Sequence, residues 1–364
     1  MSKETDIVLL GGAGDVGLRL ARILLERTAA VVTTVSRHAG VDSDRHGDRH
    51  GDRRRHISFD LSGAEPLKIT SGAIVVNLTE ATQPKLVSQV IKGGGRFLET
   101  SATPDYLRGL MAAAEATTGP GAAIFCVGVA PGLTNLMAAK IATAAPDTRQ
   151  IDIGLEMGMG RHYGMAATTW FLQTAGAPYQ VVIGHSARGV MPGALTRKFA
   201  LRQDGVLRLA IGYGFAEQVL IAERSNKALK TVRSFVALDP PWMTRSLAWM
   251  LRLGFGPAMS RHATKLAKWL LRLPAFGATH TRILGEGFDD ADHLTGQIRV
   301  ETGDQAEATA AMIFATIQSL LAREKPAKTG VTLISDHLHF DAAALTLQRL
   351  LPQTTISGNI GESQ

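Results

Sequence analysis

The sequence predicts an α/β protein with a doubly wound parallel sheet in the first third of the chain and a second, α+β domain after it. Up to about residue 127, short apolar runs alternate with helical patterns, which is typical of parallel strands joined by crossover helices. From about Gln150 to Thr302 longer strands mix with helices and the strict alternation stops. The chain has 364 residues, 45% of them hydrophobic, so it can bury two cores.

The expected elements follow from apolar periodicity. In the first third we expect strands at Asp6–Leu10, Ala30–Val35, Ala73–Leu78, Arg96–Glu99 and Ala122–Val127, with helices at Val16–Arg27 and Lys85–Lys92. In the second domain we expect strands at Gln150–Met157, Gln180–Ile183, Arg197–Leu201, Thr231–Leu238 and Gly296–Glu301. Helices at Gln305–Arg323 and Phe340–Leu351 close the chain. We therefore expect a first domain at residues 1–135 and a second domain at residues 136–325. The C-terminal segment 326–364 is a candidate for packing against the first domain again.

Composition excludes several classes of protein. Cys126 is the only cysteine, which rules out an internal disulfide framework and fits a reducing compartment. The first residues, MSKETD, contain no apolar signal region, and no apolar run is long enough to span a bilayer. We therefore expect a cytoplasmic location. The net charge of +7 is spread widely and only 5% of residues are aromatic, which argues against a nucleic-acid partner and suits an anionic small molecule.

A glycine-rich turn follows the first strand. The stretch GGAGDVG contains both GxGxxG and GxxGxxG spacing and opens an amphipathic helix. Glycines in this context allow a tight turn, close approach of the backbone to a pyrophosphate, and close packing of the helix on the sheet. The stretch predicts a dinucleotide-binding Rossmann domain in residues 1–135, in which the cofactor contacts come from Gly11, Gly12, Ala13, Gly14, Asp15, Val16 and Gly17.

The end of the second strand predicts which dinucleotide binds. NAD enzymes commonly place an acidic residue there, since a carboxylate accepts hydrogen bonds from the ribose hydroxyls. This chain has Ser36 and Arg37 instead. A hydroxyl and a guanidinium suit the 2′-phosphate of NADP(H), so we favour NADP(H) over NAD(H); the alternative is that both residues are simply exposed in a loop.

The remaining strand ends supply further candidates, because ligands of such sheets bind at the carboxyl ends of the strands. Asn77, Leu78, Thr79 and Ser101 are expected near the nicotinamide end of the cofactor. Glu99 is a candidate substrate contact, and Tyr106 is either a catalytic group or core packing. Gly128, Pro131 and Gly132 are further expected cofactor contacts, and they form a turn before a helix whose N-terminus can hold a substrate carboxylate. We expect Cys126 to be a core residue, because no basic neighbour would ionise it.

The segment 42–56 reads DSDRHGDRHGDRRRH. Its His and Asp content raises the alternative of a metal site, but no apolar residue supports the ligands. We expect a solvated loop and no metal in the protein.

Four stretches together resemble the saccharopine dehydrogenase (saccharopine reductase) superfamily. They are GGAGDVG, FLETSATPDY, GVAPGLTNLMA, and VETGDQAEATAAMIFATIQSLLARE followed by TGVTLI. The resemblance implies an NAD(P)-binding domain, a second domain for substrate and dimer contacts, and reversible reduction of an imine to a secondary amine. The family also includes enoyl- and ketone-reductase-like members.

An opine-type substrate requires cationic residues in the second domain. Arg161 and Arg188 are the candidates for binding its carboxylates, with Arg197 and Lys198 as further options. His162 is the candidate general acid, because histidine exchanges protons near neutrality. None of these residues forms a motif that matches the saccharopine enzymes.

The stretch SLAWMLRLGFGPAMSRHATKLAKWLLRL predicts two basic amphipathic helices. We favour an interdomain or dimer-interface helix pair, and contact with a membrane surface is the less favoured alternative. Three functions remain open: an NADP-dependent oxidoreductase acting on C=N or C=O bonds in a small molecule, a reductase for a lipid-type enone or ketone, and a non-catalytic NADPH-binding protein.

Overall fold

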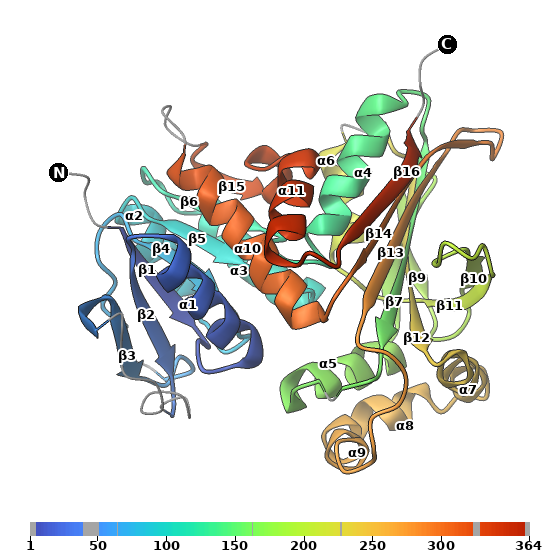
Figure 1. Cartoon of the computed structure of the whole chain (residues 1–364), viewed down its shortest axis with the longest axis horizontal. Helices are drawn as coiled ribbons and strands as arrows, with labels where there is room; N and C mark the ends of the chain where they lie inside the picture. The colour runs from blue at the N-terminus through green and yellow to red at the C-terminus, as the bar shows by residue number, and fades with distance from the viewer. Residues whose placement is uncertain are drawn as a thin grey trace. The chain divides into compact units, whose positions relative to one another are not determined.

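The computed structural model divides the chain into two compact units (Figure 1). Unit 1 comprises Met1–Leu136 and Ala306–Leu350, and unit 2 comprises Met137–Gln305 and Leu351–Gln364. The structure describes residues 5–38, 51–63, 65–161, 163–225, 228–322 and 328–360.

Unit 1 contains a seven-stranded, wholly parallel sheet. The sequence predicts a parallel sheet and five of these strands, but not β3 or β15. The strand order is β15-β6-β5-β4-β1-β2-β3, so the direction of winding reverses between β1 and β4. The strands are β1 (Asp6–Leu10), β2 (Val31–Ser36), β3 (Arg54–Ser58), β4 (Ile74–Asn77), β5 (Arg96–Glu99), β6 (Ala122–Phe125) and β15 (Gly330–Leu333).

Helices cover both faces of this sheet, which makes it a doubly wound α/β unit. They are α1 (Asp15–Arg27), α2 (Pro84–Lys92), α3 (Pro104–Glu115), α10 (Gln305–Leu321) and α11 (Phe340–Leu350). α1 and α10 bury their apolar sides in one core with alternate residues of β1, β2 and β4, while α2 and α3 pack on β5 and β6. Each fully buried large aliphatic side chain in such a core contributes about 1.5–3 kcal/mol.

The position of α10 corrects the predicted domain boundary. The sequence placed residues 306–325 in the second domain, but Ala310, Ile313 and Phe314 are buried against β1, β2 and β4 of unit 1. The C-terminal segment also divides, because α11 belongs to unit 1 whereas β16 (Thr355–Ile360) pairs with β14 of unit 2. An apolar helix face shows in the sequence, but the surface that it covers does not.

Unit 2 is built on a mixed sheet, which agrees with the predicted α+β class. Its main path runs β10-β11-β12-β7-β13-β14-β16, with the hairpin β8–β9 attached through β12. Among the described strands of unit 2, only β7 and β12 pair in parallel. The remaining strands are β7 (Gln150–Gly158), β8 (Tyr179–Ile183), β9 (Ser186–Val190), β10 (Thr196–Phe199), β11 (Arg208–Gly212), β12 (Thr231–Asp239), β13 (Thr281–Phe288) and β14 (Leu294–Thr302).

The remaining helices are α4 (Leu133–Ala144), α5 (Met165–Gly176), α6 (Glu217–Arg224), α7 (Pro241–Arg252), α8 (Gly256–Arg261) and α9 (Ala263–Leu270). The predicted helix pair after residue 242 is therefore three helices. α7 ends in a Schellman motif: Gly254 has φ +85°, and the N–H groups of Gly254 and Phe255 donate to the carbonyls of Leu251 and Met250. Within the described residues no helix combines the length and apolarity needed to cross a bilayer.

The end of the predicted solvated loop forms regular secondary structure. Residues 42–50 lie outside the described residues, but Gly51–Arg53 form a 3-10 turn and Arg54–Ser58 form β3. β3 has no buried residue, and pairing with β2 supplies its backbone hydrogen bonds. The loop prediction is therefore wrong for residues 54–56, because a fully exposed edge strand leaves no apolar pattern in the sequence. Among the described residues no group of His, Cys, Asp or Glu has the arrangement of a metal site.

Candidate functional site

In the glycine turn between β1 and α1, backbone segments approach each other very closely. Gly11 has φ +79°, and a Cβ atom at Gly17 would lie 2.6 Å from the Gly12 Cα. A Cβ at Gly12 would lie 2.8 Å from the Thr34 Cβ. The backbone therefore excludes larger side chains, and Gly14 caps α1 without a side-chain hydrogen bond. This arrangement fits a pyrophosphate bound at the helix N-terminus.

The other predicted cofactor residues lie at the same edge of the sheet, because the strands are parallel. The Gly11 N–H donates to the Val35 carbonyl at 2.8 Å, and the Leu78 N–H donates to the Leu10 carbonyl at 2.9 Å. The Val127 N–H donates to the Glu99 carbonyl at 2.9 Å. The edge is therefore continuous from the end of β2 to the end of β6, and it collects Gly11–Gly17, Ser36, Arg37, Asn77, Leu78, Thr79, Ser101 and Gly128.

Two hydrogen bonds within residues 128–135 hold the turn between β6 and α4. The Leu133 N–H donates to the Gly128 carbonyl, and the Gly132 N–H donates to the Asn135 Oδ1, at 2.9 and 2.8 Å. A Cβ at Gly132 would lie 2.0 Å from the Gly128 oxygen, so no other residue fits there. Pro131 follows a cis peptide bond in this turn.

Exposed polar and basic side chains surround the end of β2. The Ser36 hydroxyl donates to the His38 carbonyl, and the Ser58 hydroxyl donates to the Arg37 carbonyl at 3.1 Å. The Arg37 side chain is exposed. The adjacent strand β3 also carries two exposed arginines, but Arg54 and Arg55 pair with Val32 and Thr33 and so lie at the start of β2, away from Ser36.

A buried polar network is centred on Asn77 at the end of β4. Its Nδ2 donates to the Glu99 Oε2 at 2.6 Å and to the Tyr106 hydroxyl at 2.9 Å, and its Oδ1 accepts from the Thr82 hydroxyl at 2.6 Å. The Tyr106 hydroxyl lies 3.2 Å from each of the carbonyl oxygens of Thr79 and Thr82. Tyr106 is thus held inside the network, and these contacts fit a positioning role for it.

Glu99 is fully buried at the end of β5. Burial raises the pKa of its carboxyl to about 8, against the opposing hydrogen bonds from Asn77 and the Ser101 N–H. The carboxyl is therefore mostly protonated at neutral pH. Burial, and next the nearby Glu99, also raise the pKa of Tyr106.

The predicted substrate residues of unit 2 lie in different settings. Arg161 follows β7, and its Nε lies 3.1 Å from the Asp304 Oδ2. Arg188 is exposed on β9, opposite Val181. His162 lies outside the described residues. The hydroxyl of its neighbour Tyr163 donates to the Gly158 carbonyl at 2.9 Å.

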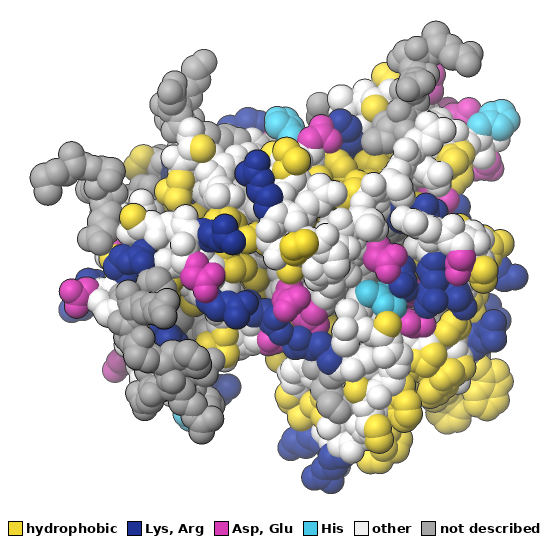
Figure 2. All heavy atoms as spheres, in the orientation of Figure 1, with side chains coloured by type: hydrophobic (Ala, Val, Ile, Leu, Met, Phe, Trp, Pro, Cys, Tyr) yellow, Lys and Arg dark blue, Asp and Glu magenta, His cyan; other side chains and the backbone are white. Residues whose placement is uncertain are grey.

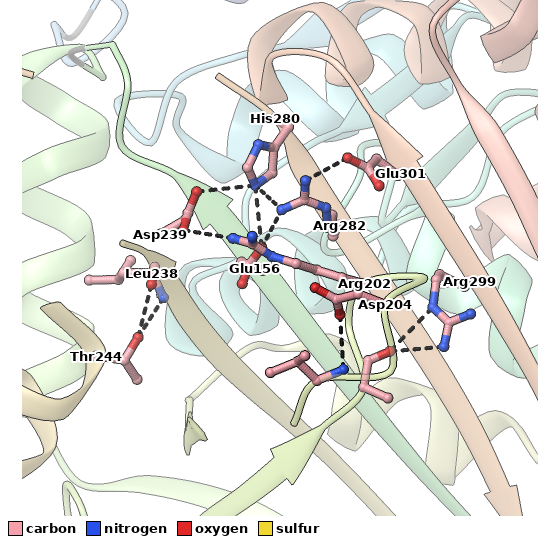
Figure 3. A network of polar contacts seen from close by, with 12 residues as sticks. Glu156, Arg202, Asp204, Leu238, Asp239, Thr244, His280, Arg282, Arg299 and Glu301 are labelled. Carbon is pink, nitrogen blue, oxygen red and sulfur yellow. Dashed lines mark hydrogen bonds and ion pairs between the residues drawn. The ribbon is translucent and has the colours of Figure 1, made fainter. Parts of the chain in front are cut away.

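One face of the unit 2 sheet carries buried ion pairs that were not predicted (Figure 3). Glu156 of β7 is 1% exposed and contacts Arg282 of β13, His280 at 3.3 Å and Arg202 at 3.4 Å. Arg202 also binds Asp239 at 2.7 Å, and Arg282 binds Glu301 at 2.7 Å. Burial alone would raise the pKa of Glu156, but hydrogen bonds from His280 and Arg282 and the charge of Arg202 lower it to about 2.

A second ion-pair cluster lies on the same sheet face, four residues earlier on β7. Asp152 is fully buried and accepts from Arg233 at 2.6 and 2.7 Å and from Arg197. Arg197 also pairs with Glu286 at 2.9 Å, so this candidate substrate residue is engaged by carboxylates. The sequence signal for both clusters is the alternation of charged with apolar residues, as in IDIGLEMG and TRILGEGF. Recognising it requires knowing that this sheet face is buried.

Comparison with known proteins gives structural matches only. No protein-family model matches the chain, and no curated protein matches its sequence. Among solved structures, the apo saccharopine dehydrogenase (L-Glu forming) from Saccharomyces cerevisiae matches with a TM-score of 0.59 at 11% identity, over 97% of this chain and 100% of that one. The chain has the fold of this dehydrogenase.

Two further structures match less well than saccharopine dehydrogenase. The C. glutamicum DAP dehydrogenase in complex with DAP has a TM-score of 0.43 at 9% identity, and it covers 91% of this chain and 93% of that one. An engineered D-amino acid dehydrogenase bound to NADP+ has a TM-score of 0.45 at 10% identity, with the same coverage. The saccharopine dehydrogenase match agrees with the predicted combination of a Rossmann domain and a second α+β domain.

Proposed function

We propose that this chain is an NADP(H)-dependent oxidoreductase that acts on a C=N or C=O bond of a small molecule. The observation that carries the proposal is the glycine turn, where Gly17 packs against the Gly12 backbone at the carboxyl edge of a seven-stranded parallel sheet. The likeness of the whole chain to saccharopine dehydrogenase favours reduction of an imine to a secondary amine.

The cofactor would be held by three groups of residues. Backbone N–H groups of the turn Gly11–Gly17 would bind the pyrophosphate. Ser36 and Arg37 would bind the 2′-phosphate. Asn77, Leu78 and Thr79 would line the nicotinamide end. When bound, the cofactor supplies the hydride.

The residues of unit 1 would orient the cofactor. The Asn77 network fixes the chain from Thr79 to Thr82, because the hydroxyls of Tyr106 and Thr82 both bond within it. Protonated Glu99 leaves this network without a net negative charge at neutral pH, which suits a site that must bind a polyanionic cofactor. For the substrate, Arg161 and Arg188 remain the proposed carboxylate ligands and His162 the proposed proton donor.

Calorimetric titration with NADPH and NADH tests the proposal. We expect Arg37→Asp to weaken NADPH binding by about 10- to 100-fold, because a charge-assisted hydrogen bond to phosphate contributes about 1.5–3 kcal/mol, and to leave NADH binding unchanged or stronger. Arg22→Asp is the matched control, since Arg22 is an exposed arginine of α1 in the same unit. An unaltered NADPH to NADH preference in Arg37→Asp would contradict the assignment of the 2′-phosphate.

Turnover is tested separately by NADPH oxidation with pairs of an amino acid and a 2-oxoacid. We expect oxidation that depends on both partners. Tight NADPH binding without turnover of these pairs or of enones would favour a non-catalytic NADPH-binding protein, and absence of binding to either cofactor would overturn the proposal.

A further inference from the structure

Unit 2 exposes an unusual number of large apolar side chains on one segment. Seven of the fifteen exposed large hydrophobic residues in the described part of the chain lie between residues 242 and 276. Trp242, Trp249 and Trp269 are 56%, 64% and 56% exposed. We call the exposed side chains of Trp242, Trp249, Met250, Leu253, Phe255, Trp269 and Phe276 the tryptophan face.

The core of unit 2 does not require these side chains. α7 packs inward through Thr244, Leu247, Ala248 and Leu251, and it contacts β11 and β12. α9 packs through Ala263 and Ala267, and α5 contacts both α8 and α9. The exposed tryptophans therefore project from the solvent side of helices whose inner sides are already buried.

The charge of the same segment has one sign. Residues 240–276 contain six Lys or Arg residues and no Asp or Glu. All six are exposed, and they are Arg245, Arg252, Arg261, Lys265, Lys268 and Arg272. Figure 2 shows yellow and dark blue surfaces together where Figure 1 places α7 to α9.

We propose that the tryptophan face docks unit 2 on the surface of an anionic phospholipid bilayer. Tryptophan rings favour the boundary between headgroups and acyl chains, because one part of the ring is apolar and its N–H is polar. Lys and Arg beside them attract anionic headgroups, and each basic side chain near such a surface strengthens binding by about fivefold.

The distribution of charge favours an anionic bilayer, and not a second copy of the chain, as the partner of the tryptophan face. In a twofold contact the same surface meets itself, so the six cations would face six cations without a carboxylate from residues 240–276 to pair with them. The docking is peripheral, because α7 has only 12 residues and α9 only 8, whereas about 20 are needed to span a bilayer.

Vesicle sedimentation of the whole protein tests the proposal. We expect binding to vesicles that contain about one third phosphatidylglycerol in phosphatidylcholine, little binding to pure phosphatidylcholine, and weakening as salt is raised. Lys265→Gln/Lys268→Gln should weaken binding by about 25-fold, from two basic residues at about fivefold each. Trp249→Ser/Trp269→Ser should weaken it at least tenfold and abolish a blue shift of the tryptophan fluorescence.

Matched variants outside the tryptophan face are the controls. Lys68→Gln/Lys92→Gln removes the same charge from exposed sites before β4 and on α2, and Leu345→Ser removes an apolar side chain that is 56% exposed on α11. Both should bind vesicles as the wild type does, and all variants should retain wild-type NADPH affinity if they are folded.

Three outcomes would overturn the proposal. The first is no binding to anionic vesicles, and the second is equal loss in the control variants. The third is a dimer in sedimentation velocity that Trp249→Ser/Trp269→Ser dissociates, which would assign the face to a second copy.

Discussion

Glu99 gives unit 1 a pH dependence of stability that one substitution should remove. Its pKa is about 8 in the native state against 4.5 for the free side chain. Between these values the unfolded chain releases a proton that the native state keeps, so the free energy of unfolding falls as pH rises. The expected loss from pH 5 to pH 8 is about 3 to 4 kcal/mol. In Glu99→Gln the group cannot ionise, and this loss should disappear.

The single cysteine makes the measurement specific to unit 1. Cys126 is fully buried in unit 1, so labelling by a fast thiol reagent in urea reports the opening of that unit, whereas all four tryptophans lie in unit 2. With a urea slope of about 2 kcal/mol per M, the wild-type midpoint for Cys126 labelling should fall by somewhat under 2 M from pH 5 to pH 8. Comparing wild type and variant at each pH cancels the ionisation of the thiol. Parallel pH profiles of the two proteins would refute the reasoning.

Two further predictions concern the ion pairs and the glycine turn. Glu156 has its pKa lowered to about 2, so it should stabilise unit 2 by about 3 kcal/mol above pH 4.5, and this stabilisation should be lost as pH falls toward 2. Tryptophan fluorescence in urea should show that loss in the wild type and not in Glu156→Gln, with Cys126 labelling unchanged at each pH; an equal acid loss in the variant would contradict the assignment. Gly17→Ala, which places a Cβ 2.6 Å from the Gly12 Cα, should weaken NADPH binding at least tenfold in calorimetry. Gly109→Ala on α3, where a Cβ meets nothing within 4 Å, should retain wild-type affinity and gain about 0.5–1 kcal/mol of stability; equal NADPH affinity in both variants would argue against a close helix approach at the cofactor site.

The two buried carboxylates of unit 2 lie on a strand whose sequence pattern does not reveal their burial. Asp152 and Glu156 alternate with apolar residues on β7, a pattern that equally describes a strand with one face in water. Both carboxylates are buried because strands on either side supply arginines: β12 and β10 for Asp152, and β13 for Glu156. Removing one partner of such a buried ion pair leaves the other charge unpaired, which lowers the free energy of unfolding by about 3–5 kcal/mol. Arg197, which the sequence offered as a candidate substrate residue, instead pairs with the buried carboxylate of Asp152.

The sequence by itself determined the features that depend on neighbours along the chain. Five of the seven strands of unit 1, the glycine turn, and the polar residues at the strand ends follow from local periodicity and from the geometry of glycine, and the structure has them at the predicted places. The resemblance in four short stretches anticipated the fold that the saccharopine dehydrogenase match shows.

Only the tertiary structure decided the features that depend on distant partners. β3 exists because β2 supplies its hydrogen bonds, and α10 belongs to unit 1 because its apolar side fits the core above β1 and β4. The ion-pair clusters join residues up to 126 positions apart, and the protonation of Glu99 depends on complete burial. The local sequence pattern determines which side of a helix or strand is apolar. Whether that side is buried, and which groups pair with it, depends on the distant elements that pack against it.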